Sequence, residues 1–166
     1  MFRETVEKIN GAGAAKIELL NKSRIKYTIS SAMAGMFVGF GIILIFTIGG
    51  LLSSAQSAVT RIVMGASFGI ALSLILMCGG ELFTGNNMIL TISTLSRKTT
   101  WKETLRVWSY SFIGNWIGSF AMAYLYSRSG LSAGSTGEYI VKVSGVKMSI
   151  PPEQLIIRGI LCNILV

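Results

Sequence analysis

Apolar residues run with little interruption through two long stretches of this chain. No Lys, Arg, Asp or Glu lies between Tyr27 and Arg61, and Glu81 is the only charged residue between Arg61 and Arg97. A helix needs about 20 apolar residues to cross the hydrocarbon core of a bilayer. The pattern therefore predicts membrane-spanning helices rather than the core of a soluble domain.

The second stretch is too long for a single crossing. As one straight helix, residues 62–95 would reach about 51 Å, whereas the hydrocarbon core is about 30 Å thick. The polar sequence GGELFTGNN interrupts this stretch at 79–87. We therefore predict a broken helix, with a loop at membrane depth and a short second half over 88–95.

The remaining segments complete an all-α fold, a polytopic membrane helix bundle. Apolar residues recur at three- and four-residue steps near the N-terminus, which is typical of an amphipathic surface helix. The other expected elements are spanning helices over 27–49 and 104–126, a polar outer loop over 127–152 and a fourth helix from Glu153. We divide the chain into an amphipathic cytoplasmic helix over 1–26 and a transmembrane pore domain over 27–166.

The two ends of the chain leave two questions. Residues 155–166 are too few to span a bilayer, so we expect the pore domain to be incomplete and to end in its fourth helix. The N-terminal helix fits either a membrane-surface anchor or a gating element at the pore mouth, and the anchor is favoured.

Composition and charge agree with a membrane location. Of 166 residues, 51% are hydrophobic and 13% charged, with a mean hydropathy of +0.62, whereas soluble domains carry about 25% charged residues. The net charge of +8 does not indicate nucleic acid, because the basic residues flank apolar segments instead of forming a separate domain. The N-terminal segment and the loop at 97–106 hold most of them, and the opposite side carries Arg61, Arg128, Lys142 and Lys147. The positive-inside rule then predicts a multi-pass protein of the cell (inner) membrane with a cytoplasmic N-terminus.

The predicted loop is the main candidate for function. Backbone groups leave a helix inside the bilayer only where protein buries them or a watery cavity receives them, and such broken helices bind ions and small substrates. Its glycines, Gly79, Gly80 and Gly85, allow tight turns, and its asparagines, Asn86 and Asn87, can bind freed backbone groups. Thr84 offers a hydroxyl, and the apolar side chains of Leu82 and Phe83 can form a constriction. The alternative, a kink with an asparagine cap, does not need so long a polar segment.

Three further features bear on chemistry. Glu81 is the only acidic residue at membrane depth, where a carboxylate is a functional candidate by default; we favour a loop anchor that accepts backbone N–H bonds. His is absent, so no imidazole metal site, cofactor or catalytic residue is predicted in this chain. Cys78 and Cys162 lie in apolar runs and are interpreted as packing residues.

Each predicted spanning helix also carries a pair of glycines four residues apart, which lets helices approach closely. The pairs are Gly35/Gly39, Gly65/Gly69 and Gly114/Gly118. We interpret them as packing contacts with no direct chemistry.

Two segments resemble motifs of a known family. The sequence GGELFTGN at 79–86 closely resembles the signature of the formate/nitrite transporter family, and RGILCNILV at 158–166 resembles that family's fourth-helix motif. The SAMAGMFVG run of the first helix and the WKETLRVWSYSFIGNWIGS start of the third follow in the family's order. The resemblance covers essentially the whole chain, and within the family the chain looks most like the hydrosulfide channel branch.

The resemblance implies a homopentamer of six-helix protomers, each with its own pore and an aquaporin-like inverted repeat. It also implies roles for individual residues. The family's outer and central constrictions match Phe68 and Leu72, the inner constriction matches Leu82, the polar loop residue matches Thr84, the outer-vestibule lysine matches Lys147, and a fourth-helix amide near the loop matches Asn163. The family's pore histidine belongs to a fifth helix, which this sequence does not reach.

We therefore expect a channel or transporter for small monovalent anions or their conjugate weak acids, with hydrosulfide, formate and nitrite as candidates and the lipid bilayer as the other partner. Apolar constrictions penalise a bare charge, so an anion drawn in by Lys147 is expected to cross as its neutral acid. An intramembrane enzyme using Cys78, Glu81 or Thr84 is disfavoured, because the chain offers no base partner for a nucleophile. A non-transporting assembly subunit is the remaining alternative.

Overall fold

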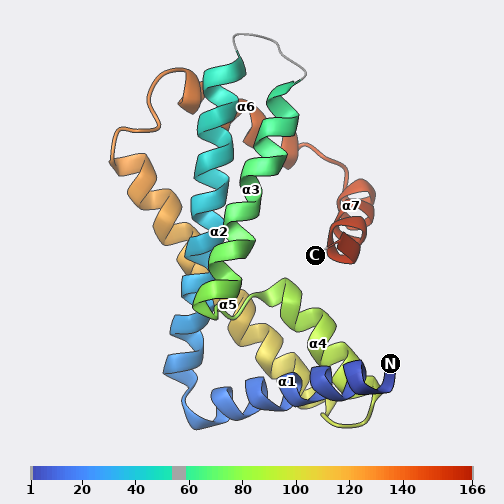
Figure 1. The fold of residues 1–166 in the computed structure, drawn as a ribbon. Coiled ribbons are helices and arrows are strands. Elements are labelled where there is room, and N and C mark those ends of the chain that lie inside the picture. The colour runs from blue at the N-terminus through green and yellow to red at the C-terminus, as the bar shows by residue number, and fades with distance from the viewer. Residues whose placement is uncertain (1, 54–58, 166) are drawn as a thin grey trace. The chain divides into compact units, whose positions relative to one another are not determined.

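The computed structural model describes residues 2–53 and 59–165, except for the side chains of Ser53, Asn163 and Leu165. Every element in this part of the chain is an α-helix, which confirms the predicted all-α class (Figure 1). The helices are α1 (Phe2–Lys22), α2 (Arg24–Ser53), α3 (Val59–Cys78), α4 (Phe83–Leu95), α5 (Trp101–Arg128), α6 (Ser135–Met148) and α7 (Pro152–Leu165).

Within the residues that the structure describes, two helices are long and apolar enough to cross a membrane, namely Arg24–Leu52 within α2 and Val59–Cys78, which is α3. The third predicted spanning helix corresponds to α5, which has 28 residues. It is long enough to cross, but Ser, Asn and Tyr residues along it lower its hydropathy. The expected helix starting near Glu153 begins one residue earlier, at Pro152, where proline is favoured because its fixed φ suits a first helical turn.

The chain divides into two compact units. The first contains Met1–Phe37 and Leu74–Ala121, and the second contains Val38–Ser73 and Met122–Val166. We describe each unit by itself.

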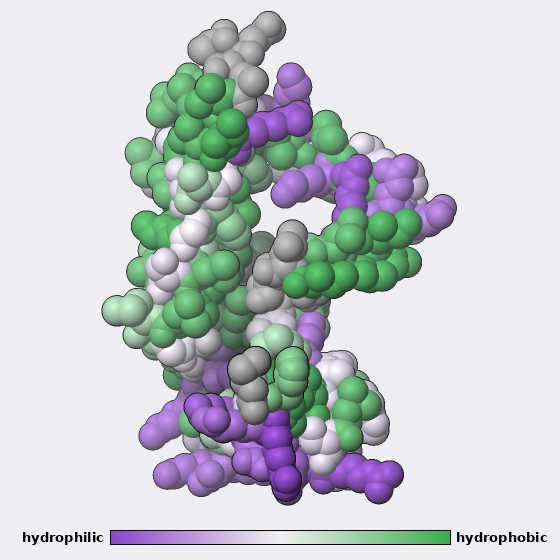
Figure 2. All heavy atoms as spheres, turned by 45° about the vertical axis from the view of Figure 1, so that its right-hand side comes forward, coloured by the Kyte–Doolittle hydropathy of each residue, from purple (hydrophilic) through white to green (hydrophobic). Residues whose placement is uncertain are grey.

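In the first unit, α1 packs along α4 (Figure 1). The side chains of Leu20, Tyr27, Leu90 and Val107 form its buried apolar core. Gly13 of α1 lies against α4, because a Cβ there would be only 2.5 Å from Oγ of Ser93. The outer face of α1 is hydrophilic, as Figure 2 shows at the lower end of that view. The predicted amphipathic helix is therefore present, and its apolar face contacts protein.

The same unit confirms close packing at two predicted glycine positions. A Cβ on Gly114 or Gly118 of α5 would collide with Ser31 or with the backbone of Ala32 on α2. These glycines let the two helix backbones approach. By contrast, a Cβ on Gly65 or Gly69 of α3 would have no close packing neighbour within 4 Å among the described residues, so the packing role predicted for that pair is not seen in this part of the protein.

In the second unit, the predicted outer loop at 127–152 proves to be mostly helical. Its α6 covers Ser135–Met148. The Gly- and Ser-rich sequence suggested a loop, but α6 is held by tertiary contacts: Tyr139 lies edge-on to Phe46 of α2, with ring centroids 6.3 Å apart, and its hydroxyl donates to Sδ of Met64 at 3.4 Å. Packing against α2 and α3 outweighs the weak helix propensity of Gly and Ser.

The predicted break in the second spanning helix is real but much shorter than expected. Between α3 and α4 only Gly79–Leu82 are non-helical, whereas the sequence predicted a loop over 79–87. Thr84, Gly85, Asn86 and Asn87 lie in the first turns of α4. The helix restarts early because a side chain of α5 accepts a hydrogen bond from the N–H of Phe83, the first residue of α4, as described below.

Candidate functional site

The break begins with a turn that only glycine adopts easily. Gly79 has a φ of +70°, in the left-handed region where other residues are strained. The N–H of Gly80 then donates to the carbonyl of Ile75 at 3.0 Å. A left-handed residue followed by a bond back over five residues is the Schellman arrangement, which satisfies the carbonyls at a helix end. The sequence thus ends α3 with two glycines for a specific physical reason.

The loop is fastened to α2 by hydrogen bonds to its backbone. The N–H of Glu81 donates to the carbonyl of Ser30 at 3.4 Å, and the hydroxyl of Ser30 donates to the carbonyl of Gly79 at 3.3 Å. A Cβ on Gly80 would lie 3.0 Å from that of Ala34. The break therefore lies directly against α2.

A second attachment comes from Asn115 of α5. Its Oδ1 accepts from the N–H of Phe83 at 2.8 Å. Its Nδ2 donates to the carbonyls of Ser31 at 2.7 Å and of Glu81 at 2.9 Å. One carboxamide thus binds the carbonyl of Glu81 and the first N–H of α4, which have no partner within a helix, together with a carbonyl inside α2. Leu82, the residue before α4, provides no side-chain cap of its own.

The carboxylate of Glu81 is buried and paired. Its Oε2 accepts from Nζ of Lys16 at 2.8 Å and from the hydroxyl of Tyr27 at 3.1 Å. Nδ2 of Asn86 donates to the same hydroxyl at 2.9 Å. The sequence predicted that Glu81 would accept bonds from backbone N–H groups. This prediction is wrong, because the donors are side chains of α1 and α2. Burial favours this arrangement, since a buried charge needs an opposite charge and hydrogen bonds.

Asn86 of α4 forms hydrogen bonds with both α2 and α5. It is almost fully buried, its side chain bonds Tyr27 of α2, and its carbonyl accepts from the indole N–H of Trp108 on α5 at 3.3 Å. The sequence expected it to satisfy backbone groups of a loop, whereas in the structure its side chain supports a tyrosine hydroxyl.

Two polar groups near the start of α4 have no hydrogen-bond partner within the described protein. They are Oγ1 of Thr84 and Oδ1 of Asn87, which lie three residues apart and hence on one side of the helix. Both atoms are shielded from solvent, although the residues as a whole are partly exposed. An unpaired buried oxygen costs about 1–3 kcal/mol. The hydroxyl of Thr84 can accept a hydrogen bond from a further group or donate one to it, whereas the amide oxygen of Asn87 can only accept.

Other predicted path residues lie in the second unit. Phe68 and Leu72 are one turn apart on α3, and Phe68 contacts the α2 helix beside Gly41. Lys147 is an exposed residue in the last turn of α6, and its ammonium lies 5.9 Å from the ring centroid of Phe46. This is a cation–π distance. The constrictions predicted at Phe68, Leu72 and Leu82 and the vestibule role predicted for Lys147 stay predictions, and the side chain of Asn163 lies outside the described part of the structure.

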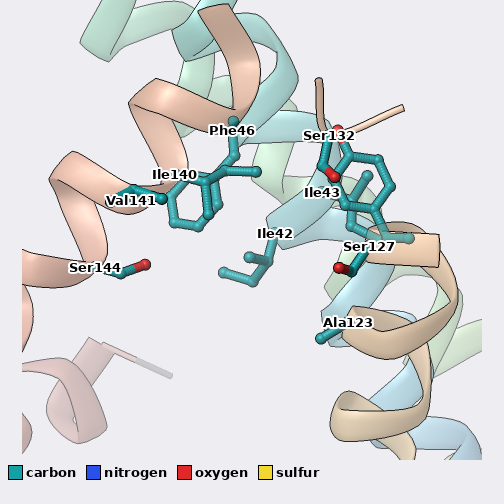
Figure 3. Close-up of a pocket in the computed structure, with 11 residues that line it drawn as sticks. Ile42, Ile43, Phe46, Ala123, Ser127, Ser132, Ile140, Val141 and Ser144 are labelled. Carbon is teal, nitrogen blue, oxygen red and sulfur yellow. The ribbon is translucent and has the colours of Figure 1, made fainter. Parts of the chain in front are cut away.

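The second unit also contains a pocket of about 430 Å³. Figure 3 shows Ile42 and Phe46 of α2 facing Ile140 and Val141 of α6 across it, with Ala123 of α5 at one side. Its walls are mainly apolar, and the described residues that line it include no charged side chain. Among the predicted path residues whose side chains the structure describes, none lines this pocket.

Sequence reasoning missed Lys16, Tyr27 and Asn115, whose side chains bind Glu81 or the backbone beside it. A signal existed for two of them. Tyr27 begins the first apolar stretch as a lone polar ring, and Asn115 sits between Gly114 and Gly118 in an apolar helix, where an amide needs partners. Neither position indicated which partner it would find.

Comparisons with known proteins agree with this geometry. Residues 3–166 match the sequence profile described as "Formate/nitrite transporter". The chain is 42% identical to the nitrite transporter NirC of Salmonella typhimurium across its whole length, which covers 61% of that relative. It is 29% identical to the formate channel BtFdhC of Bacillus thuringiensis, over 81% of this chain and 52% of the relative. A solved structure of an FNT family ion channel superposes with a TM-score of 0.82 at 36% identity, covering 90% of this chain and 59% of that one.

The chain belongs to the formate/nitrite transporter family, whose members are membrane proteins that act as transporters and channels. It spans about three fifths of the length of the first relatives it matches. The predicted family and fold class are both confirmed.

Proposed function

We propose that the protein carrying this chain conducts small monovalent anions, or their conjugate weak acids, across a membrane, with nitrite and formate as the first candidates. One observation carries the proposal: a helix is broken over Gly79–Leu82, and the side chains of neighbouring helices bind the backbone groups that the break frees. Non-helical backbone is tolerated at membrane depth when protein buries it or water lines it. The names of the relatives, a nitrite transporter and a formate channel, support these two substrates.

Hydrosulfide is a third candidate. All three anions are small, singly charged and derived from weak acids, and an apolar constriction favours the neutral acid over the bare charge. The conjugate acid of hydrosulfide has a pKa near neutrality, so protonating it costs little free energy. The proposed path residues are Phe68, Leu72, Leu82, Phe83, Thr84, Lys147 and Asn163.

The unpaired hydroxyl of Thr84 supports its place on this path. Oγ1 is buried at the first turn of a half-helix without a hydrogen-bond partner among the described residues. The backbone N–H groups and the helix dipole favour an anion at such a helix start. Gly79, Gly80, Glu81, Gly85 and Asn86 then support the loop rather than contact the substrate.

Flux into proteoliposomes tests the proposal. The complete protein is reconstituted, and uptake of nitrite, formate and hydrosulfide is followed over one pH series in vesicles of equal size. We expect saturable uptake of at least one anion, rising toward acidic pH if the neutral acid is the permeant form. Uptake equal to that of empty vesicles for all three would contradict the proposal and favour a non-transporting assembly subunit.

We also propose that the protein is a multi-pass homopentamer with a cytoplasmic N-terminus, located in the cell inner membrane. The excess of basic residues before 27 and at 97–106 supports the orientation. The domain division, a cytoplasmic helix over 1–26 and a pore domain over 27–166, belongs to the same proposal. Native mass spectrometry of the purified complete protein measures the subunit number, and labelling of a cysteine introduced at Glu4 in sealed vesicles measures the orientation.

A further inference from the structure

We infer that Asn115 is a positioning residue that sets the substrate selectivity of the broken helix, an inference that rests on the proposed function. Its carboxamide is the shared attachment of three elements: the loop, the start of α4 and the backbone of α2. Asn115 itself is assigned no contact with the substrate.

Both donors and the acceptor oxygen of Asn115 are hydrogen-bonded to backbone groups. An amide offers two N–H donors and one carbonyl oxygen. Here both donors meet carbonyls, of Ser31 and Glu81, and the oxygen meets the N–H of Phe83. The two bonds to the loop bracket Leu82, since one binds the carbonyl before it and the other the N–H after it. The backbone that carries Leu82 is thus fixed from both sides.

Close helix packing makes this reach possible. Asn is a short side chain, so α5 must approach both α2 and the loop. A Cβ on Gly35 of α2 would collide with the backbone of Asn115, and one on Gly114 would collide with Ser31. The small residues therefore bring the α5 backbone to the distance at which the amide spans all three partners.

A neighbouring residue on the same face of α5 holds the side chain that follows the loop. Phe112, one turn before Asn115, meets Phe83 edge-on with ring centroids 5.3 Å apart. Phe83 is consequently bound twice by α5, through its ring and through its N–H. Thr84 comes next in the chain, so the direction of its hydroxyl depends on this fixed first turn.

Two variants of Asn115 and one control separate positioning from general packing. Asn115→Ala removes all three bonds. Asn115→Asp keeps an acceptor for the N–H of Phe83 but places carboxylate oxygens against two carbonyl oxygens. The control is Ser119→Ala, which lies one turn further along α5 and removes a bond of 3.0 Å to the carbonyl of Gly35 without touching the loop.

The first measurement is hydrogen exchange of the loop in the complete protein. We expect the amide of Phe83 to exchange about tenfold faster or more in Asn115→Ala, because a buried donor has lost its acceptor. The same amide should stay protected in Asn115→Asp and in Ser119→Ala. Equal protection of Phe83 in Asn115→Ala and wild type would overturn the inference.

The second measurement is selectivity in proteoliposomes, with formate and the larger acetate as probes. We expect the ratio of acetate to formate uptake to rise several-fold in both Asn115 variants and to stay at the wild-type value in Ser119→Ala. A role in stability alone would lower both fluxes together and leave the ratio unchanged, which would overturn the inference. The inference is also overturned if neither Asn115 variant can be recovered folded while Ser119→Ala can. Absence of uptake by wild type would instead refute the proposed function.

Discussion

Lys16 and Glu81 lie 65 positions apart in the sequence, and Nζ of the first is 2.8 Å from Oε2 of the second. Their side chains are only 17% and 11% exposed. This ion pair joins the N-terminal helix to the loop between α3 and α4. The hydroxyl of Tyr27 shares the same carboxylate oxygen, so α1, α2 and the loop meet at one charged group.

Breaking this pair should destabilise the protein strongly. Removing one partner of a buried ion pair typically costs about 3–5 kcal/mol, because the other charge stays buried without compensation. We expect Glu81→Gln to lower the thermal unfolding temperature of the purified complete protein by several degrees.

The exposed pair between Lys8 and Glu4 on α1 provides a matched control. It has a similar distance, 2.9 Å, but its side chains are 77% and 72% exposed. Exposed pairs contribute about 0–1 kcal/mol, so Glu4→Gln should leave the unfolding temperature nearly unchanged. Equal shifts for the two variants would show that Glu81 does not anchor the loop.

Thr84→Ala should change anion flux without loss of stability. Its hydroxyl makes no hydrogen bond within the described protein, so removing it breaks no protein contact. On the same helix, Thr94 bonds Thr99 at 3.0 Å and Thr104 at 2.7 Å, and Thr94→Ala should cost about 1–3 kcal/mol. Flux per folded protein and thermal stability are measured for both. A Thr84→Ala variant with wild-type flux for every anion would remove the residue from the path.

Lys147→Glu should slow anion uptake from the side on which α6 lies, most clearly at low salt. A charge about 7 Å from an entering anion contributes roughly 2 kcal/mol at an effective dielectric constant near 20. Salt screens an exposed charge over about 8 Å at physiological ionic strength. We therefore expect the half-saturating concentration to rise several-fold in low salt and the difference to shrink in 1 M salt.

Lys142→Glu makes the same charge change on the same helix and is the control. Lys142 is also exposed, but only Lys147 lies over the ring of Phe46. If both variants slow uptake equally, the effect comes from the net charge of α6 and not from the position of Lys147.

The start of α5 should show a pH-dependent contribution to stability. Oε2 of Glu103 accepts from the hydroxyl of Thr100 at 2.7 Å and from its N–H at 2.8 Å, and the hydroxyl of Thr100 accepts from the N–H of Glu103 at 3.3 Å. This is a capping box. The bond from the hydroxyl of Thr100, followed by that from its N–H, lowers the pKa of the Glu103 carboxyl.

A carboxyl group whose pKa is lower in the folded than in the unfolded protein stabilises the folded state at pH values above its ordinary, unfolded pKa. This contribution is lost as the pH falls through the pKa of the folded state. Glu103→Gln should therefore be less stable than wild type at neutral pH, and the gap should close as pH falls below the ordinary pKa of glutamate. Thermal unfolding of both proteins, from neutral to acidic pH, measures the difference in stability. A gap that stays constant with pH would show that the charge of Glu103 has no part in the cap.

The sequence alone determined the features that depend on local order along the chain. Uninterrupted apolar residues predicted the helices later seen as α2 and α3, and the paired glycines at 79–80 located the break between α3 and α4. The specific order of residues in GGELFTGN indicated the family. These features are readable because helix formation, burial in a bilayer and left-handed turns each impose a rule on neighbouring residues.

Tertiary structure decided the length of the break and the partners of its polar groups. The helix restarts at Phe83 because Asn115, 32 positions later, accepts its N–H. The Gly- and Ser-rich segment at 135–148 becomes α6 because Tyr139 packs against α2. Such contacts join residues that are distant in sequence, and no local pattern states which free donor a distant amide will reach. That choice depends on how closely the glycines allow the helix backbones to approach.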